Sequence, residues 1–179
     1  MRLIFALTAV VLSMGMASTH PSQAAPSSSE IQALTVAFLY NFMKLSEWPS
    51  ESIVNEITLC AIKADDNAID LDSLADKDIQ NYKLKIKHLV PGDTLGGCQL
   101  LFIPENEKPI RVREWLKNME NQPVLTVSNI TGFIDLGGMI ELVSDGNHLQ
   151  FEVNLAPVEH VGIKLSSKML QIAKEVKGQ

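Results

Sequence analysis

Two cysteines, Cys60 and Cys98, are the residues with the clearest potential chemistry in this 179-residue sequence. Each lies in a short apolar run, residues 57–62 and 98–103, of the kind that forms a buried strand. Adjacent strands could join the two thiols as a disulfide, which the chain-entropy model credits with about 4 kcal/mol of stability. The same residues allow a second interpretation, in which both are free thiols buried in the core.

Residue patterns of catalytic and metal centres are missing from the sequence. The histidines that follow the N-terminal segment, His88, His148 and His160, share no metal-ligand spacing with one another or with the cysteines. The sequence contains no Gly-x-Ser-x-Gly elbow, no Ser-x-x-Lys pair and no glycine-rich phosphate loop. We therefore expect a protein that is not an enzyme and that needs neither a metal nor a cofactor.

Carboxylates give no better candidate for catalysis. Asp135, Glu141 and Glu152 could in principle pair for acid–base chemistry. Their spacing singles out no pair, and we expect each carboxylate to be solvated.

Alternating side chains make residues 149–155 the most informative polar segment. In a strand, successive side chains point to opposite faces. The apolar set, which we expect to face the core, comprises Leu149, Phe151, Val153 and Leu155. The opposite row comprises His148, Gln150, Glu152 and Asn154. This row is either an ordinary solvent face or a surface that meets a partner.

The N-terminal segment has the pattern of a secretory signal peptide, residues 1–24. Arg2 precedes a nearly continuous apolar stretch, residues 3–16, which is shorter than the 20 or so residues of a membrane span. Small residues, Ser22 and Ala24, then occupy the −3 and −1 positions of a cleavage site. Cleavage after Ala25 and a retained N-terminal anchor are the alternatives. We predict an exported protein that does not insert into the membrane after cleavage.

Composition excludes several kinds of partner. The sequence has a formal net charge of −6 and no run of basic residues. Nucleic acids and anionic lipid headgroups select basic surfaces, so neither is an expected partner. Export also places the two cysteines in an oxidising compartment, which favours the disulfide over free thiols.

Helix and strand patterns alternate along the rest of the sequence. Residues 25–29 are a Ser-rich segment that we expect to be a flexible leader, with Ser28 or Ser29 capping a helix over residues 31–45. Later helices are predicted at 109–119, at 156–161 as a short turn, and from Ser166 or Ser167 to about Val176; residues 65–75 are predicted as a helical crossover. Strands are predicted at 56–62, 82–89, 98–103, 123–128, 139–144 and 148–155, the last two joined by an Asp-Gly turn.

This order predicts the α/β fold class. We expect a single three-layer domain over residues 30–177, in which helices flank a mixed, mostly parallel sheet. The sheet should become antiparallel at the C-terminal hairpin, and a helix should close the fold.

Six segments in order resemble the YfiR family of small periplasmic proteins. They are Phe38–Pro49, Cys60 in its strand, Cys98 before Leu100–Ile103, Pro123–Ser128, Gly132–Phe133 with Gly137–Ile140, and Phe151–Asn154 with Ser166–Leu170. Their order and number make the resemblance much more specific than any one segment alone.

The resemblance implies a function as well as a fold. Members of the family repress a membrane diguanylate cyclase by binding its periplasmic sensor domain, which lowers cyclic-di-GMP and biofilm formation. An outer-membrane lipoprotein can sequester the repressor, and the best-known member is a homodimer. A small-ligand-binding sensor module of another signalling or export system is the alternative function.

The resemblance also assigns roles to residues of this sequence. The family disulfide maps onto Cys60 and Cys98, and the region implicated in partner control maps onto Glu152, Asn154 and Val158. One departure stands out, because a second disulfide around the terminal hairpin has no counterpart here. The hairpin must therefore be held by its Asp-Gly turn and its apolar face.

Overall fold

Apolar runs of the sequence become strands of one mixed sheet in the computed structural model, which describes residues 27–53, 55–64, 69–145 and 148–178. The predicted signal peptide, residues 1–24, lies outside the described residues. Within them the sheet has eight strands, in the spatial order β10 (Glu175–Lys177), β8 (Leu149–Asn154), β7 (Ile140–Ser144), β6 (Leu125–Ser128), β5 (Leu100–Ile103), β2 (Glu56–Ile62), β4 (Tyr82–Leu89) and β3 (Asp78–Ile79).

The centre of the sheet is parallel. Strands β7, β6, β5, β2 and β4 run in one direction, whereas β8 is antiparallel to β7 and β3 is antiparallel to β4. At the outer edge, β10 runs parallel to β8. Parallel neighbours need crossover connections that pass over a face of the sheet, which is why helices flank it. The predicted α/β class with a mixed, mostly parallel sheet is confirmed.

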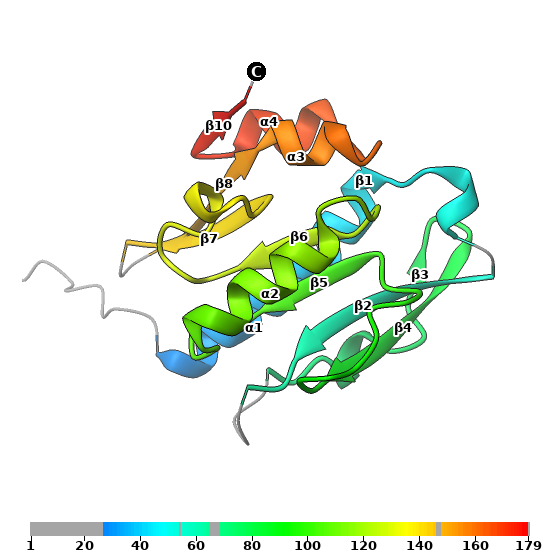
Figure 1. Ribbon diagram of the computed structural model, residues 1–179, viewed down its shortest axis with the longest axis horizontal. Helices are drawn as coiled ribbons and strands as arrows, with labels where there is room; N and C mark the ends of the chain where they lie inside the picture. The colour runs from blue at the N-terminus through cyan, green and yellow to red at the C-terminus, as the bar shows by residue number, and fades with distance from the viewer. Residues whose placement is uncertain (1–26, 54, 65–68, 146–147, 179) are drawn as a thin grey trace, which may run out of the picture.

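Two long helices cover opposite faces of this sheet, α1 (Ser28–Leu45) behind it and α2 (Pro109–Met119) in front (Figure 1). The central strands serve both layers because their side chains alternate. In β2, Leu59 packs into the core cluster on the α1 side and Cys60 into the cluster on the α2 side. In β5, Phe102 and Leu101 divide in the same way. The molecule therefore has two apolar cores separated by the sheet.

The start of α1 differs from the predicted one. Ser27 is the N-cap: its Oγ accepts from the Glu30 N–H at 3.3 Å, and the Ser27 N–H donates to the Glu30 carboxylate at 2.6 Å. This reciprocal capping box satisfies two backbone donors at once. The hydrogen bond from the Ser27 backbone lowers the pKa of Glu30. Ser28 and Ser29, expected in a flexible leader or as caps, are the first residues of the helix.

Short elements complete the C-terminal side of the fold. The helix α3 (Leu155–His160) follows β8, and α4 (Ser167–Ile172) packs near α1. Between them, β9 (Lys164–Leu165) pairs with β1 (Ser46–Glu47), the two residues that follow α1. Elsewhere in the described residues, the chain forms the 3-10 turns η1 (Ser50–Ser52), η2 (Asp72–Leu74) and η3 (Ile134–Leu136).

Two of the predicted helices are wrong in extent. Within the predicted crossover 65–75, whose described part begins at residue 69, the structure has only η2. The chain is bent there by Asp76 at φ 60° and enters the β3–β4 hairpin, which covers the sheet edge. The closing helix stops at Ile172, and the next residues become β10. The edge of β8 accounts for this difference. Its backbone N–H and C=O groups can form ladder hydrogen bonds with a neighbouring strand, and β10 supplies that strand.

Candidate functional site

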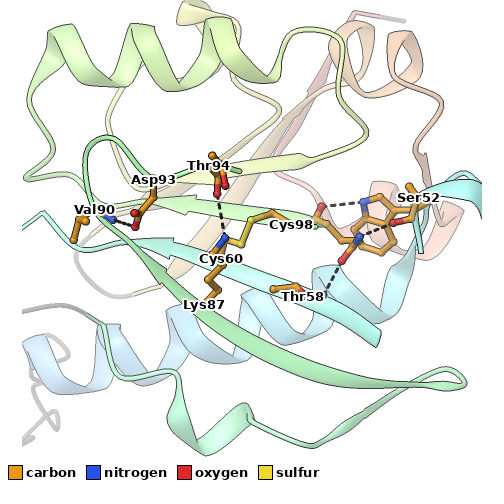
Figure 2. The surroundings of a disulfide bond; sticks show 10 residues. Ser52, Thr58, Cys60, Lys87, Val90, Asp93, Thr94 and Cys98 are labelled. Atoms are coloured by element: carbon orange, nitrogen blue, oxygen red, sulfur yellow. Dashed lines mark hydrogen bonds between the residues drawn. A yellow bond between two sulfur atoms is a disulfide. The ribbon is translucent and has the colours of Figure 1, made fainter. Parts of the chain in front are cut away.

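Cys60 and Cys98 form a disulfide between β2 and the residues that lead into β5 (Figure 2). Their Cα atoms lie 5.8 Å apart, and the bond closes a loop with a sequence separation of 38. The two residues are 0% and 4% exposed, in the core on the α2 side. Thiol exchange requires access to a sulfur atom, so this buried bond acts as a structural cross-link.

The residue next to Cys98 extends this cross-link into a hydrogen-bond network. Gln99 accepts from the Thr58 N–H at 2.7 Å and donates to the Ser52 carbonyl at 2.8 Å, while its own carbonyl accepts from the Trp48 indole N–H at 2.9 Å. Figure 2 shows Ser52 and Thr58 on this side of the disulfide. The network ties the segment between α1 and β2 to β5 without leaving the Gln99 side chain unpaired.

The loop on the other side of the disulfide is held by polar contacts. Lys87 donates to the Thr94 carbonyl at 3.1 Å, and the Asp93 carboxylate accepts from the Val90 N–H at 2.9 Å (Figure 2). Both contacts lie in exposed positions and link β4 to the turn before Cys98. Together with the disulfide, these contacts fix the position of the loop that leads into β5.

A second polar region, the polar face, lies on the C-terminal strands. We define it as Gln150, Glu152 and Asn154 of β8, Glu141 of β7, and the neighbouring charges Asp135, Lys174 and Lys177. Phe151 and Val153 are buried in the core on the α1 side, so Glu152 and Asn154 point to the opposite side of the sheet. The antiparallel register places Glu141 directly across from Glu152.

Lysines from the last strand region fix the charges of the polar face. Lys174 donates to Glu152 at 2.6 Å, and Lys177 donates to Asp135 at 3.2 Å. The hydrogen bond with Glu152 raises the pKa of Lys174, and that with Asp135 raises the pKa of Lys177. The Glu152 side chain keeps 13% of its surface exposed and Gln150 is exposed, so the face remains open to contact.

Glu141 anchors the turn η3 to β7. Its carboxylate accepts from the Gly132 N–H at 3.0 Å and from the Ile134 N–H at 3.4 Å, and the residue is 6% exposed. Asn154 adds a third link by donating to the Ile134 carbonyl at 3.3 Å. The expectation that Glu141 is solvated was wrong, because the backbone donors of the glycine-punctuated loop replace water around its carboxylate.

The sequence-predicted partner residues have different places in the structure. Glu152 and Asn154 lie together on the polar face, both partly exposed. Val158 lies on α3 with 0% exposure, inside the core on the α1 side. A direct contact of Val158 with a partner is therefore blocked in this structure, and its side chain can influence the face only through packing. Leu155, assigned to the apolar face of the strand, begins α3 instead and is 8% exposed.

The hairpin between β7 and β8 is held without a disulfide. The Asp145 carboxylate accepts from the His148 N–H at 2.8 Å, and the Asp145 N–H donates to the His148 carbonyl at 3.2 Å. Gly146 and Asn147, the rest of the predicted Asp-Gly turn, lie outside the described residues.

A groove that the sequence did not predict opens between α2 and α3. It encloses about 610 Å³ and has an apolar floor that includes Met119 and Met139. Arg113 and Lys117 contribute from α2 and Leu136 from η3, and His160 lies on the α3 side. The one sequence feature that could have indicated the groove is the spacing of Arg113 and Lys117, which are four residues apart and so lie on one helix face. What the sequence could not supply is the position of α3 against that face.

The comparison with family models decides the relationship of this chain. A model described as YfiR/HmsC-like matches residues 32–174, which include the disulfide, the groove and all of the polar face except Lys177. The chain belongs to the YfiR/HmsC-like family. The resemblance drawn from six sequence segments is thereby confirmed. A search of curated proteins found no match.

YfiR/HmsC-like proteins are periplasmic regulators. Across the described residues of this member, no three His, Cys, Asp or Glu side chains are grouped so that they could hold a metal ion. None of the helices in the described part of the chain has the length and hydropathy of a membrane span.

Proposed function

We propose that this YfiR/HmsC-like protein represses a membrane diguanylate cyclase by binding the periplasmic sensor domain of that enzyme through the polar face. The observation that carries the proposal is the pairing of Glu152 with Lys174 at 2.6 Å on a strand whose other side is core. The carboxylate is partly exposed, yet its position is fixed by its neighbours.

Fixed charges suit a binding surface. A partner that meets pre-positioned groups does not have to order them, so less conformational entropy is lost on association. On this face, Glu141 and Asn154 hold η3, and Lys177 holds Asp135. Charged groups placed in this way mainly determine which partner binds and how fast it binds.

Three finer parts of the proposal rest on the resemblance to the best-known member of the family. The exported chain works in the periplasm as a homodimer, an outer-membrane lipoprotein competes with the cyclase for it, and release of the cyclase raises cyclic-di-GMP and biofilm formation. The buried disulfide supports the placement, because such bonds persist in oxidising compartments.

A matched pair of variants in cells tests the proposal. Deletion of the gene should raise cyclic-di-GMP, and the wild-type gene should restore the original level. Glu152→Lys should fail to restore it, because it places two cations side by side at the surface that binds the cyclase. Asp78→Lys is the control: it breaks the Lys83–Asp78 ion pair (2.7 Å) in the same way on β3, at the opposite edge of the sheet.

The outcome separates the proposal from other accounts. Equal amounts of the two variant proteins in the periplasm exclude a folding defect. If Glu152→Lys then restores cyclic-di-GMP as well as Asp78→Lys does, the polar face is not the surface that binds the cyclase. If deletion leaves cyclic-di-GMP unchanged in cells that express the protein, the protein is not a repressor.

The groove supports a second candidate, a small-ligand-binding sensor module. Its volume of about 610 Å³ is within the range of about 300–1,000 Å³ that is usual for small-molecule sites. The two functions are compatible, since a regulator can carry both a ligand site and a partner surface.

A further inference from the structure

The groove between α2 and α3 combines an apolar interior with a cationic rim. Met119 and Met139 are 2% and 4% exposed and form its floor, while Leu136 on its edge is 46% exposed. Methionine side chains are flexible and polarizable, so such a floor can adapt to different apolar shapes. The lining therefore suits a ligand with an apolar body.

Charges on the rim restrict the other end of that ligand. Arg113 and Lys117 line the groove from successive turns of α2, and both are exposed. Neither side chain takes part in a hydrogen bond or an ion pair among the described residues, whereas Arg111 on the same helix is paired with Glu107. Two cations at the mouth of an apolar groove, in a protein of net charge −6, favour an anionic ligand.

The charge of the ligand can be narrowed further. Glu120 also lines the groove, so the rim carries two fixed positive charges and one negative charge. His160 lies on the same rim, and its Nε2 is 3.0 Å from the amide oxygen of Asn121. One carboxylate next to Arg113 and Lys117 neutralises the net positive charge of this rim. A dianion would exceed that charge and be repelled by Glu120.

We propose that this groove binds a small amphipathic monocarboxylate, with the carboxylate on Arg113 and Lys117 and the apolar chain against Leu116, Met119 and Met139. Arginine and lysine form charge-assisted hydrogen bonds with carboxylates, and these are stronger than neutral ones. Burial of the apolar chain supplies the larger part of the affinity, because free energy scales with the apolar area removed from water. This site is separate from the polar face.

The turn η3 connects the two regions. Leu136 lines the groove, while the preceding residue, Asp135, pairs with Lys177, and the Ile134 carbonyl accepts from Asn154. A ligand that packs against Leu136 therefore touches the same turn that the polar face holds. This link between ligand and partner rests on the proposed function, but binding in the groove does not.

A titration of the isotope-labelled exported chain with decanoate, at concentrations below micelle formation, tests the site. Decanoate should bind with a Kd of about 0.01–1 mM and shift the NMR signals of Leu116, Leu136 and Met139. Arg113→Gln and Lys117→Gln together should weaken binding about tenfold, because each removes one charge-assisted contact. Lys63→Gln, an exposed charge change at the end of β2, should leave the affinity unchanged.

A second pair of variants tests the apolar part of the groove without risk to the fold. Leu136→Gln should weaken decanoate binding several-fold, since Leu136 is exposed at the edge of the groove. Ile110→Gln is its control, because Ile110 is 60% exposed on α2 and does not line the groove.

A change of the ligand's head group tests the cationic rim. Decyltrimethylammonium, with the same chain and a positive head, should bind at least tenfold more weakly than decanoate.

Several results would overturn the inference. These are no shift at 1 mM decanoate, equal affinity for the cationic amphiphile, or unchanged affinity in the Arg113 and Lys117 double variant. Each is measured on the purified protein alone, so such a failure leaves the proposed repressor function standing. Conversely, a failure of cyclase binding would leave the decanoate site intact.

Discussion

The two halves of the sheet are built in different ways. Strands β2 and β5 are apolar on both faces: all four residues of β5 are buried, and β2 is buried from Leu59 to Ile62. In β8, buried and partly exposed residues alternate, so one face is core and the other is polar. Strands covered by helices on both sides have no free face, whereas β8 has one to offer.

The contacts that stabilise the two halves also differ: one half is held by buried links and the other mainly by polar contacts nearer the surface. A disulfide and the Gln99 network hold β2 and β5, whereas Glu141, the Asp145 turn and lysine ion pairs hold β7, β8 and β10. Buried covalent and hydrogen-bonded links keep a scaffold in one shape. Exposed ion pairs are worth little to stability, so a partner can replace them at small cost. We infer that the first half is scaffold and the second half is contact surface.

Removal of the disulfide should have the largest effect on stability. In the Cys60→Ala/Cys98→Ala variant the unfolded chain regains the entropy of a loop with a sequence separation of 38, and the free energy of unfolding should fall by about 4 kcal/mol. Urea denaturation measures this loss, and a reducing agent should lower the Tm of the wild type but not that of the variant. A loss under about 1 kcal/mol would show that the scaffold half does not depend on the bond.

A methyl group at Gly138 should have the next largest effect. A Cβ at this position would overlap the ring of Phe133, which is fully buried, so Gly138→Ala should lower the free energy of unfolding by about 2–3 kcal/mol. Gly96→Ala is the control in the scaffold half, because its Cβ would meet no atom within 4 Å. Urea denaturation measures the free energy of unfolding of both variants. Equal values would mean that the loop before β7 can repack around the added methyl group.

Loss of the buried carboxylate should loosen η3. Glu141→Ala leaves the Gly132 and Ile134 N–H groups without their acceptor and should cost about 2 kcal/mol. Hydrogen exchange should accelerate at those two amides. Glu175→Ala on β10 is an exposed control that should change neither quantity. Unchanged exchange at Gly132 and Ile134 would contradict the role of Glu141 as the anchor of the polar face.

The ion pair at Lys174 should have the smallest effect on stability. Lys174→Gln should move the Tm by no more than about 2 °C, because the lysine side chain is 45% exposed and solvent screens its charge. The pKa of Lys174 is raised in the folded state, so its contribution is complete below the ordinary lysine pKa and is lost only as the pH rises through the folded value. The Tm difference from wild type should therefore be constant between pH 6 and pH 9. A difference that changes in this interval would mean that another group titrates at this site.

How much of the fold the sequence predicts depends on the half considered. The bounds of β2, β4 and α2 agree with the predicted residues 56–62, 82–89 and 109–119, because proline, glycine and unbroken apolar or alternating runs define them locally. By contrast, β10 was missed, since Glu175–Lys177 becomes a strand only because β8 offers it an edge. The predicted helical crossover was also wrong: in its described part, Leu71 and Leu74 are buried in the core at the short turn η2, with no longer helix around them.

The candidate site was predictable only in part. Alternation along β8 and the family resemblance indicated Glu152 and Asn154, and the structure places them together on one face. The partners of that face come from elsewhere in the chain: Glu141 lies across the hairpin, Lys174 immediately precedes β10, and Lys177 is the last residue of β10. Such contacts depend on strand order and register, which no local pattern specifies. Val158 shows the converse: the resemblance assigned it to the region of partner control, but its side chain is buried on α3.

Binding of the purified exported chain to the sensor domain of its partner cyclase tests the central claim most directly. The cyclase can be identified by pull-down from membranes with the tagged chain, and its periplasmic domain used in calorimetry. Wild type and Asp78→Lys should bind with affinities within a factor of two of each other, and Glu152→Lys should bind more than tenfold more weakly while its Tm is retained. Undiminished binding by folded Glu152→Lys would contradict the assignment of the polar face as the contact surface.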